Sequence, residues 1–289
     1  MQNYAKNIST ILVTKKISDA PKAKKPVLVV GAGPSVKARD HLSQLNHWFE
    51  ESSPGRDAIV IMATDRMLVP LLEAGIIPDY SITVDGNREK IVKWYDHPLV
   101  SEHKLRQGVI LGNTVAPNVS EVLLNRGQTI FWFTPMLDGF NLAHGITKLM
   151  FYMTEAAAVN CGGNAGTAGW AVANYLQATQ IAFIGLDFGY LEGTPIEQTA
   201  YYETLQQLIR TNPNAINGFY FDDYNPDFGI KCYSDVMFKH YKLGFAEMLT
   251  QSKIPSFNCT EGGIVHGSGI RGMKLVDWLK TIEPLQVPA

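Results

Sequence analysis

Features that mark secreted, membrane-spanning and nucleic-acid-binding proteins are scarce in this sequence of 289 residues. Its three cysteines are odd in number and widely spaced, which favours reduced thiols over a disulfide framework. No apolar run approaches the roughly 20 residues that span a bilayer, and the first residues do not resemble a secretory signal. The formal net charge of -2 at pH 7 provides no basic surface for nucleic acid. We therefore expect a cytoplasmic protein that has no membrane span and does not bind nucleic acid.

Metal-binding motifs are absent as well. The cysteines do not form a CxxC pair and the seven histidines do not include an HExxH motif, so we predict no metal site. The apolar share of 46% is ordinary for a soluble globular protein. At this length it is sufficient to build a substantial core.

The stretch around which the chain is organised combines a strand, a glycine turn and the start of a helix. Val27–Val30 is a short apolar run rich in β-branched residues, which is typical of a buried strand. The tight turn that follows consists of Gly31, Gly33 and Pro34. Ser35 stands where a helix N-cap is expected, so backbone N–H groups and the helix dipole would converge on a phosphate. A plain tight turn between strand and helix is the alternative, and Val36 replaces the third glycine of the NAD fingerprint.

Further apolar strands alternate with segments of helical spacing and predict the fold class. Strands are expected at 57–63, 78–85, 108–113, 128–135, 180–187 and 254–260, and helices at 37–49, 65–73, 90–95, 164–176, 235–249 and 273–279. This alternation predicts an α/β protein with a doubly wound, Rossmann-like, mostly parallel sheet and helices on both faces. We interpret residues 1–25 as an arm and solvated linker, mobile or packed against the domain, and 26–285 as the domain. The aromatic stretch at about 189–237 is expected to be a lid or binding insertion.

Polar residues close several of the expected strands. In doubly wound sheets, ligands bind beyond the carboxyl ends of the strands. The candidates at those ends are Ser35, Thr64, Asp65, Asp85, Asn87, Asn113 and Asp187. For each of them the alternative is a polar residue that merely terminates an apolar strand.

Two other segments contribute candidate binding residues. Gly163 leads into Asn164, a good N-cap for the helix expected at 164–176, and Thr167 lies in its first turn. Small residues on this helix permit a close approach, either to the sheet or, at a second phosphate-facing N-terminus, to a ligand. In the aromatic stretch, tyrosines offer stacking area and hydroxyl groups to a phosphate or a sugar.

Five motifs in order resemble one superfamily. They are Val-Gly-Ala-Gly-Pro-Ser at 30–35, Ile-Pro-Asp-Tyr at 77–80 with Val-Asp-Gly at 84–86, Gly-Gly-Asn-Ala-Gly-Thr at 162–167, Ile-Gly-Leu-Asp-Phe-Gly-Tyr at 184–190 and Asn-Cys-Thr-Glu-Gly-Gly at 258–263. This set is similar to the proteins related to archaeal 6-hydroxymethylpterin diphosphokinase, which include the bacterial motility accessory factors (Maf). The resemblance covers roughly residues 25 to 280. The first and fourth motifs also look, more distantly, like the CMP-binding motifs of bacterial sialyltransferases.

The resemblance to Maf proteins implies a transferase that moves a sialic-like sugar from a CMP-activated donor to a hydroxyl of a protein or glycan acceptor such as flagellin. The turn from Gly31 to Ser35 would then hold the donor's nucleotide or phosphates. Base, ribose or sugar would be oriented by Asn87, Asn113 and Thr167. The leaving phosphate would be hydrogen-bonded by Tyr190, Tyr201 or Tyr202. The acceptor proton would be taken by Asp235 or His240.

Two alternatives remain open at this point. A diphosphokinase would use Asp85, with Asp65 or Asp187, to hold Mg²⁺ against ATP, but the sequence carries a single aspartate in the Asp-Gly motif and no histidine-rich stretch after it. The other alternative is a non-catalytic module that binds a nucleotide or a sugar. No cofactor is firmly implied beyond the nucleotide substrate.

Overall fold

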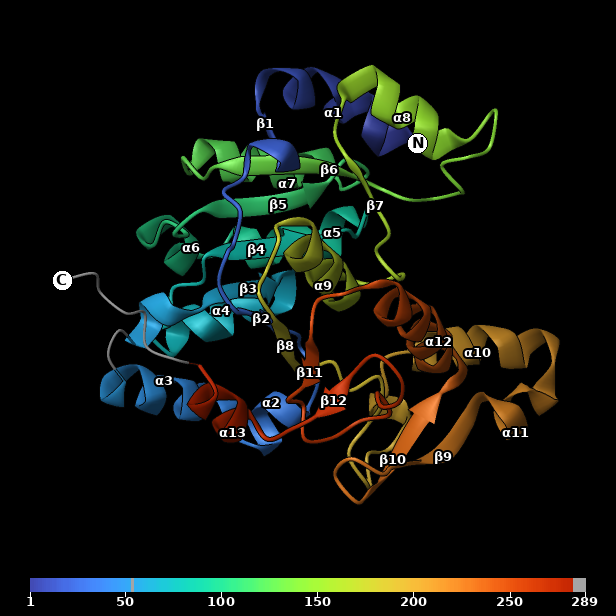
Figure 1. The fold of residues 1–289 in the computed structure, drawn as a ribbon. Coiled ribbons are helices and arrows are strands. Elements are labelled where there is room, and N and C mark those ends of the chain that lie inside the picture. The colour runs from blue at the N-terminus through green and yellow to red at the C-terminus, as the bar shows by residue number, and fades with distance from the viewer. Residues whose placement is uncertain (53–54, 283–289) are drawn as a thin grey trace.

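A ten-stranded sheet organises the computed structural model, which describes residues 1–52 and 55–282 (Figure 1). Within these residues the sheet order is β1-β6-β5-β4-β3-β2-β8-β11-β12, with β7 paired to β6, and every pair is parallel. The strands are β1 (Lys15–Lys16), β2 (Val27–Val30), β3 (Val60–Thr64), β4 (Tyr80–Thr83), β5 (Gly108–Gly112), β6 (Ile130–Pro135), β7 (Ala158–Val159), β8 (Ile181–Ile184), β11 (Ser256–Asn258) and β12 (Arg271–Gly272). A separate antiparallel hairpin joins β9 (Tyr220–Asn225) to β10 (Ile230–Asp235).

Helices follow most of the strands, as expected for a doubly wound fold. They are α1 (Gln2–Val13), α2 (Ser35–Ala38), α3 (His41–Glu51), α4 (Asp65–Glu73), α5 (Arg88–Tyr95), α6 (Pro98–Glu102), α7 (Pro117–Asn125), α8 (Ile146–Thr154), α9 (Ala165–Tyr175), α10 (Tyr202–Thr211), α11 (Ile216–Phe219), α12 (Val236–Gln251) and α13 (Leu275–Lys280). The predicted helix at 65–73 matches α4 at both ends, with Pro70 inside it. The predicted helix at 37–49 is instead divided into α2 and α3, because Asp40 between them adopts a left-handed conformation with φ of 53°.

Both faces of the sheet are buried, because successive side chains of a strand point to opposite faces. Val29 belongs to an apolar cluster that includes Phe245 of α12, whereas its neighbour Val30 belongs to another cluster that includes Trp278 of α13. The four residues of β2 are fully buried. The predicted class, an α/β protein with a parallel sheet and helices on both faces, is thereby confirmed.

Helix α1 and strand β1, both within the segment at 1–25, are packed onto the sheet. Helix α1 buries Tyr4 and Ile11 in the cluster that covers β5 and β6, and β1 pairs with β6, where Lys15 lies opposite Phe131. The two lysines are accommodated because β1 is a short edge strand, a position where charged side chains remain in solvent. The division of the chain at residue 25 stays a prediction.

The aromatic stretch at 189–237 contains helices and a hairpin that were not predicted from the sequence. Helix α10 is followed by the β9–β10 hairpin, and Gly229 in the connecting turn has a φ of 67°. The hairpin lies beside α12, at the side of the molecule away from α1 and α8 (Figure 1). Of the helices in residues 1–52 and 55–282, none combines the length and apolar composition that a bilayer crossing requires.

Candidate functional site

The strand order creates a switch point between β2 and β8. From β2 the chain proceeds outward through β3, β4, β5 and β6, whereas β8 and β11 lie on the other side of β2. In open parallel sheets, ligands bind at such a reversal, beyond the carboxyl ends of the strands. The segments at those ends are 31–35 after β2 and 185–187 after β8.

Glycines allow these two segments to touch each other. The backbone N–H groups of Gly31 and Gly33 donate to the carbonyl oxygens of Ile184 and Gly185, at 2.9 and 2.8 Å. A Cβ atom on Gly31 would lie 2.5 Å from the Gly185 oxygen, and one on Gly33 would overlap the Asp187 carboxylate. The glycines that resembled a phosphate cradle therefore make room for a neighbouring strand end of the same chain.

Asp187 occupies the position at which a bound phosphate was expected. Its Oδ1 accepts a hydrogen bond from the Ser35 backbone N–H at 3.2 Å, and its Oδ2 accepts one from Ser35 Oγ at 2.8 Å. The assignment of Ser35 as an N-cap is wrong, because Ser35 is the first residue of α2 and its hydroxyl binds Asp187. Pro34 takes the N-cap position.

Burial changes the acidity of this carboxyl group. Asp187 is 4% exposed, and desolvation raises its pKa to about 7 in spite of the two hydrogen bonds from Ser35, which lower it. A carboxyl group with that pKa exchanges a proton near neutral pH, which is the property required of a general acid or base.

A cavity of about 440 Å³ opens above Asp187. Its lining includes Ser35, Arg39, Tyr190, Lys231, Glu261 and Gly262. The Nε–H of Arg39 donates to the Glu261 carbonyl oxygen at 3.2 Å, which ties the end of α2 to the loop after β11. Arg39 and Lys231 are exposed and bring positive charge to a site whose floor is a carboxyl group.

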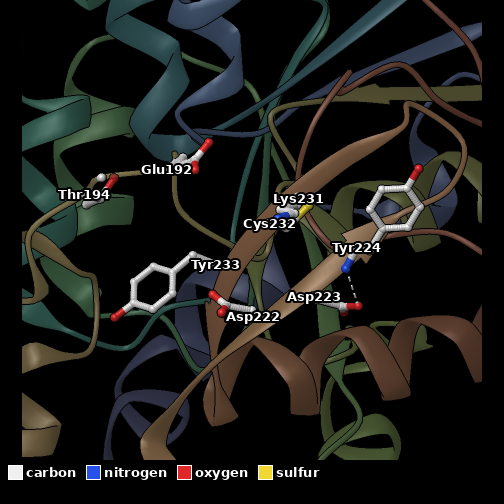
Figure 2. Close-up of a pocket in the computed structure, with 9 residues that line it drawn as sticks. Glu192, Thr194, Asp222, Asp223, Tyr224, Lys231, Cys232 and Tyr233 are labelled. Carbon is white, nitrogen blue, oxygen red and sulfur yellow. Dashed lines mark hydrogen bonds between the residues drawn. The ribbon is translucent and has the colours of Figure 1, made fainter.

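A second cavity, of about 720 Å³, adjoins the first and shares Glu192, Lys231 and Cys232 with it. In Figure 2 the hairpin lies between two other segments. One is the loop that carries Glu192 and Thr194, and the other is a helix beneath the hairpin. The Tyr224 backbone N–H donates to Asp223 Oδ1 at 2.8 Å. Residues of both hairpin strands line the second cavity, so the hairpin forms one of its walls.

Tyr190, which is half-buried, and Asp235, which is buried, form a pair at the edge of the first cavity. The Tyr190 hydroxyl donates to Asp235 Oδ2, and Asp235 Oδ1 accepts from the backbone N–H groups of Met237 and Phe238 at 2.8 and 2.9 Å. Asp235 is therefore the N-cap of α12, with both carboxylate oxygens engaged. Burial, together with the Asp235 carboxylate, raises the pKa of Tyr190.

The other predicted tyrosines and the α9 residues lie around α12. The Tyr201 hydroxyl donates to that of Tyr241 at 3.1 Å, and a Cβ atom on Gly163 would lie 2.8 Å from the Tyr241 ring. Asn164 caps α9 by accepting from the Thr167 N–H at 3.0 Å. Tyr202 begins α10, and His240 is an exposed residue of α12.

The remaining predicted residues lie at the ends of β3, β4 and β5. At β3, the Thr64 hydroxyl donates to the Val30 carbonyl oxygen and Asp65 accepts from the Thr83 hydroxyl. Asp85 is exposed and accepts from the Asn87 N–H at 2.8 Å, and Asn87 caps α5. Asn113 is buried and donates to Thr134 Oγ1 at 2.8 Å. No hydrogen bond of the described residues links the side chains of Asp85, Asn87 and Asn113 to the cavity at the switch point.

Several cavity residues could not be selected from the sequence. Arg39 follows a four-residue helix with no distinguishing pattern, and Lys231 belongs to a hairpin that was not anticipated. Glu261 offered one signal, because a glycine-rich loop follows the strand at 256–258 that neighbours β8. The Ile264 N–H in that loop donates to the Asp187 carbonyl oxygen at 2.8 Å.

Together, the fold and the cavity define a Rossmann-like α/β protein with a ligand-sized hollow at its topological switch point. Residues 2–193 match the family described as 6-hydroxymethylpterin diphosphokinase MptE-like, and the chain belongs to this MptE-like family. The resemblance predicted from the five motifs is thus confirmed.

A solved structure has the same fold. It is the MAf glycosyltransferase from Magnetospirillum magneticum AMB-1, with a TM-score of 0.62 and 16% sequence identity over 98% of this chain. The match covers 39% of that protein, so this chain spans about two fifths of its length. No curated protein matches the sequence.

Proposed function

We propose that the chain is a cytoplasmic, nucleotide-dependent transferase that moves a sialic-like sugar from a CMP-activated donor to a hydroxyl group of a protein or glycan acceptor such as flagellin. The observation that carries this proposal is the Asp187 carboxyl group, which lines a cavity at the switch point and has a pKa of about 7. The fold that the chain shares with a MAf glycosyltransferase agrees with it.

In the proposed reaction, the acceptor hydroxyl oxygen attacks the anomeric carbon of the sugar. The bond between that carbon and the phosphate oxygen of the donor breaks, and CMP leaves with the electron pair. Ionised Asp187 receives the hydroxyl proton, because its pKa lies close to the working pH. Arg39 and Lys231 at the cavity stabilise the negative charge on the departing phosphate.

Asp187 suits the role of the base better than the two residues selected from the sequence. Asp187 lines the cavity, whereas Asp235 does not line it and instead accepts from Tyr190 and caps α12. His240 is exposed on α12 and does not line the cavity. We therefore assign Asp235 to the positioning of Tyr190, whose ring lines the cavity.

The diphosphokinase alternative requires carboxylates that share a metal ion. Asp65 accepts from the hydroxyl of Thr83 and from the Arg66 N–H, Asp85 lies exposed in a turn, and Asp187 is bound to Ser35. Among residues 1–52 and 55–282, no group of three or more His, Cys, Asp or Glu side chains is arranged to hold a metal ion. These carboxylates do not fit a Mg²⁺ site of the kind that uses several protein ligands.

A melting experiment distinguishes the donor classes. CMP or CDP in the presence of EDTA should raise the melting temperature more than ATP does, because a single phosphodiester needs only hydrogen-bond donors and nearby cations. Differential scanning fluorimetry with each nucleotide, with and without Mg²⁺, measures this. Stabilisation by Mg-ATP alone, abolished by EDTA, would support the diphosphokinase instead.

Two controls complete that experiment. Arg39→Ala should reduce the CMP-dependent shift, whereas Asp85→Asn, at an exposed turn away from the cavity, should not. Release of CMP from a CMP-linked sugar then separates an enzyme from a non-catalytic module. Tight CMP binding without any CMP release would identify the binding module.

Asp235→Asn tests the positioning role. Asparagine caps helices about as well as aspartate does, so the melting temperature should change little and CMP release should remain within a few-fold of the original. A true general base would lose roughly 10²- to 10⁴-fold in rate. A loss of that size in a folded Asp235→Asn protein would return the role of the base to Asp235.

A further inference from the structure

An apolar surface lies at the end of the sheet formed by β1 and β6, away from the switch point. It is formed by α8 and the loop that precedes it, and α8 lies beside α1 on the outside of the molecule (Figure 1). Six large apolar side chains on it are between 42% and 67% exposed: Leu137, Leu142, Ile146, Leu149, Tyr152 and Met153. We call these residues the α8 surface.

The α8 surface is held in place by hydrogen bonds and ring contacts. Asp138 accepts from the backbone N–H groups of Ile146 and Thr147 at 2.7 and 3.0 Å, and so caps the helix. Thr147 Oγ1 accepts from the Leu137 N–H at 2.9 Å. The rings of Phe140 and Phe151 meet edge to face at 5.6 Å. Loop and helix therefore present one preformed surface, which reduces the entropy cost of association.

This surface is as large as the largest apolar patches of monomeric proteins, which are often functional. Six side chains exposed to this degree form a patch on the order of 600 Å², the upper end of the range for monomeric proteins. Two such patches in contact would bury roughly 1,200 Å², where the range of stable interfaces begins.

We infer that the α8 surface is the interface of a two-fold symmetric dimer in which α8 packs antiparallel to α8 of a second copy. Lys148 and Tyr152 lie one turn apart on α8, and Glu155 follows the helix as its C-cap residue. An antiparallel pairing centred beside Tyr152 places Lys148 against Glu155 of the partner subunit, and Glu155 against the partner's Lys148. Within the described residues, neither side chain forms an ion pair in its own chain. The surface thus complements itself in charge.

Sedimentation velocity and light scattering test the inference. The protein should have twice the 32.0 kDa mass of one chain at micromolar concentration, and Leu149→Glu should convert it to a monomer with an unchanged far-UV spectrum and melting profile. The matched control is Leu243→Glu, which alters a residue that is 61% exposed on α12 and should leave the dimer intact. A protein that is monomeric throughout, or a dimer that Leu149→Glu does not dissociate, overturns the inference.

A charge exchange tests the antiparallel arrangement. Lys148→Glu and Glu155→Lys should each weaken the dimer about fivefold, because each places like charges together twice across the two-fold axis. The protein with both substitutions should recover the original dissociation constant. Failure of the double variant to recover it excludes this pairing of the helices.

Discussion

Replacement of Gly33 with alanine should lower the free energy of unfolding by about 3 kcal/mol, the upper part of the usual range for overpacking. A Cβ atom at this position would overlap Asp187 Oδ2 and would lie 2.6 Å from the Gly185 carbonyl oxygen. The backbone of β8 cannot move away from the added Cβ atom, because β8 is paired on both sides, with β2 and with β11. In a protein of 289 residues, the expected fall in melting temperature is about 5 °C.

The control for this substitution is Gly244→Ala in α12. A Cβ atom on Gly244 has no neighbour within 4 Å, and alanine is favoured over glycine in a helix by about 1 kcal/mol. Gly244→Ala should therefore melt at the original temperature or slightly above it. If Gly33→Ala melts at the original temperature too, the close contact between the two strand ends is not a constraint on the fold.

Asp187→Asn should greatly slow the proposed transfer reaction. It should also remove one contribution to the pH dependence of the unfolding free energy. A pKa of about 7 in the folded protein, against 3.8 for an unperturbed aspartate, corresponds to about 4 kcal/mol. Because the pKa is raised by folding, this contribution is present below about pH 4 and is lost as the pH rises to 7. The neutral asparagine cannot ionise, so the variant should gain stability relative to the original protein over that interval.

The measurement is the difference in unfolding free energy between the two proteins, taken from urea titrations at pH 4 through pH 8. Taking the difference cancels the contributions of other groups, such as His41, whose pKa is lowered by burial. CMP release from a donor sugar should fall by roughly 10²- to 10⁴-fold in the same variant. Asp85→Asn, at an exposed site, should alter neither quantity. A difference that is constant from pH 4 to pH 8 would show that Asp187 titrates as an ordinary aspartate.

The parallel sheet could be predicted from the sequence because most of its strands are marked by residues that are close together in the chain. The predicted strands are short apolar runs bounded by glycine, proline or a polar residue, whereas β1 and β12, with two lysines and Arg-Gly, carry no such signal. Strands that are buried on both faces lack the alternation of apolar and polar residues seen in half-exposed sheets. In β2, all four residues are apolar and buried. The family resemblance depended on motifs that lie at these same strand ends.

The hydrogen bonds between Asp187 and Ser35, which change the interpretation of the site most, join residues that are far apart in the sequence. Asp187 is 152 positions from Ser35 in the chain, and only the adjacency of β2 and β8 brings them together. A glycine turn looks the same in sequence whether it surrounds a phosphate or a carboxylate of the same chain. The β9–β10 hairpin was missed for a related reason, because its exposed edge carries acidic and aromatic residues in place of an apolar run.

The pairing of β1 with β6 has a consequence for the order in which the protein is made. Lys15 and Lys16 leave the ribosome early, but their partners Phe131 and Trp132 follow 116 positions later. At the usual rates of synthesis, this delay is on the order of ten seconds. During that time the side chains of Tyr4 and Ile11, which the finished fold buries completely or nearly so, have no core to enter. Helix α1 and β1 can therefore dock only after β6 has been made, although they precede it by more than a hundred residues.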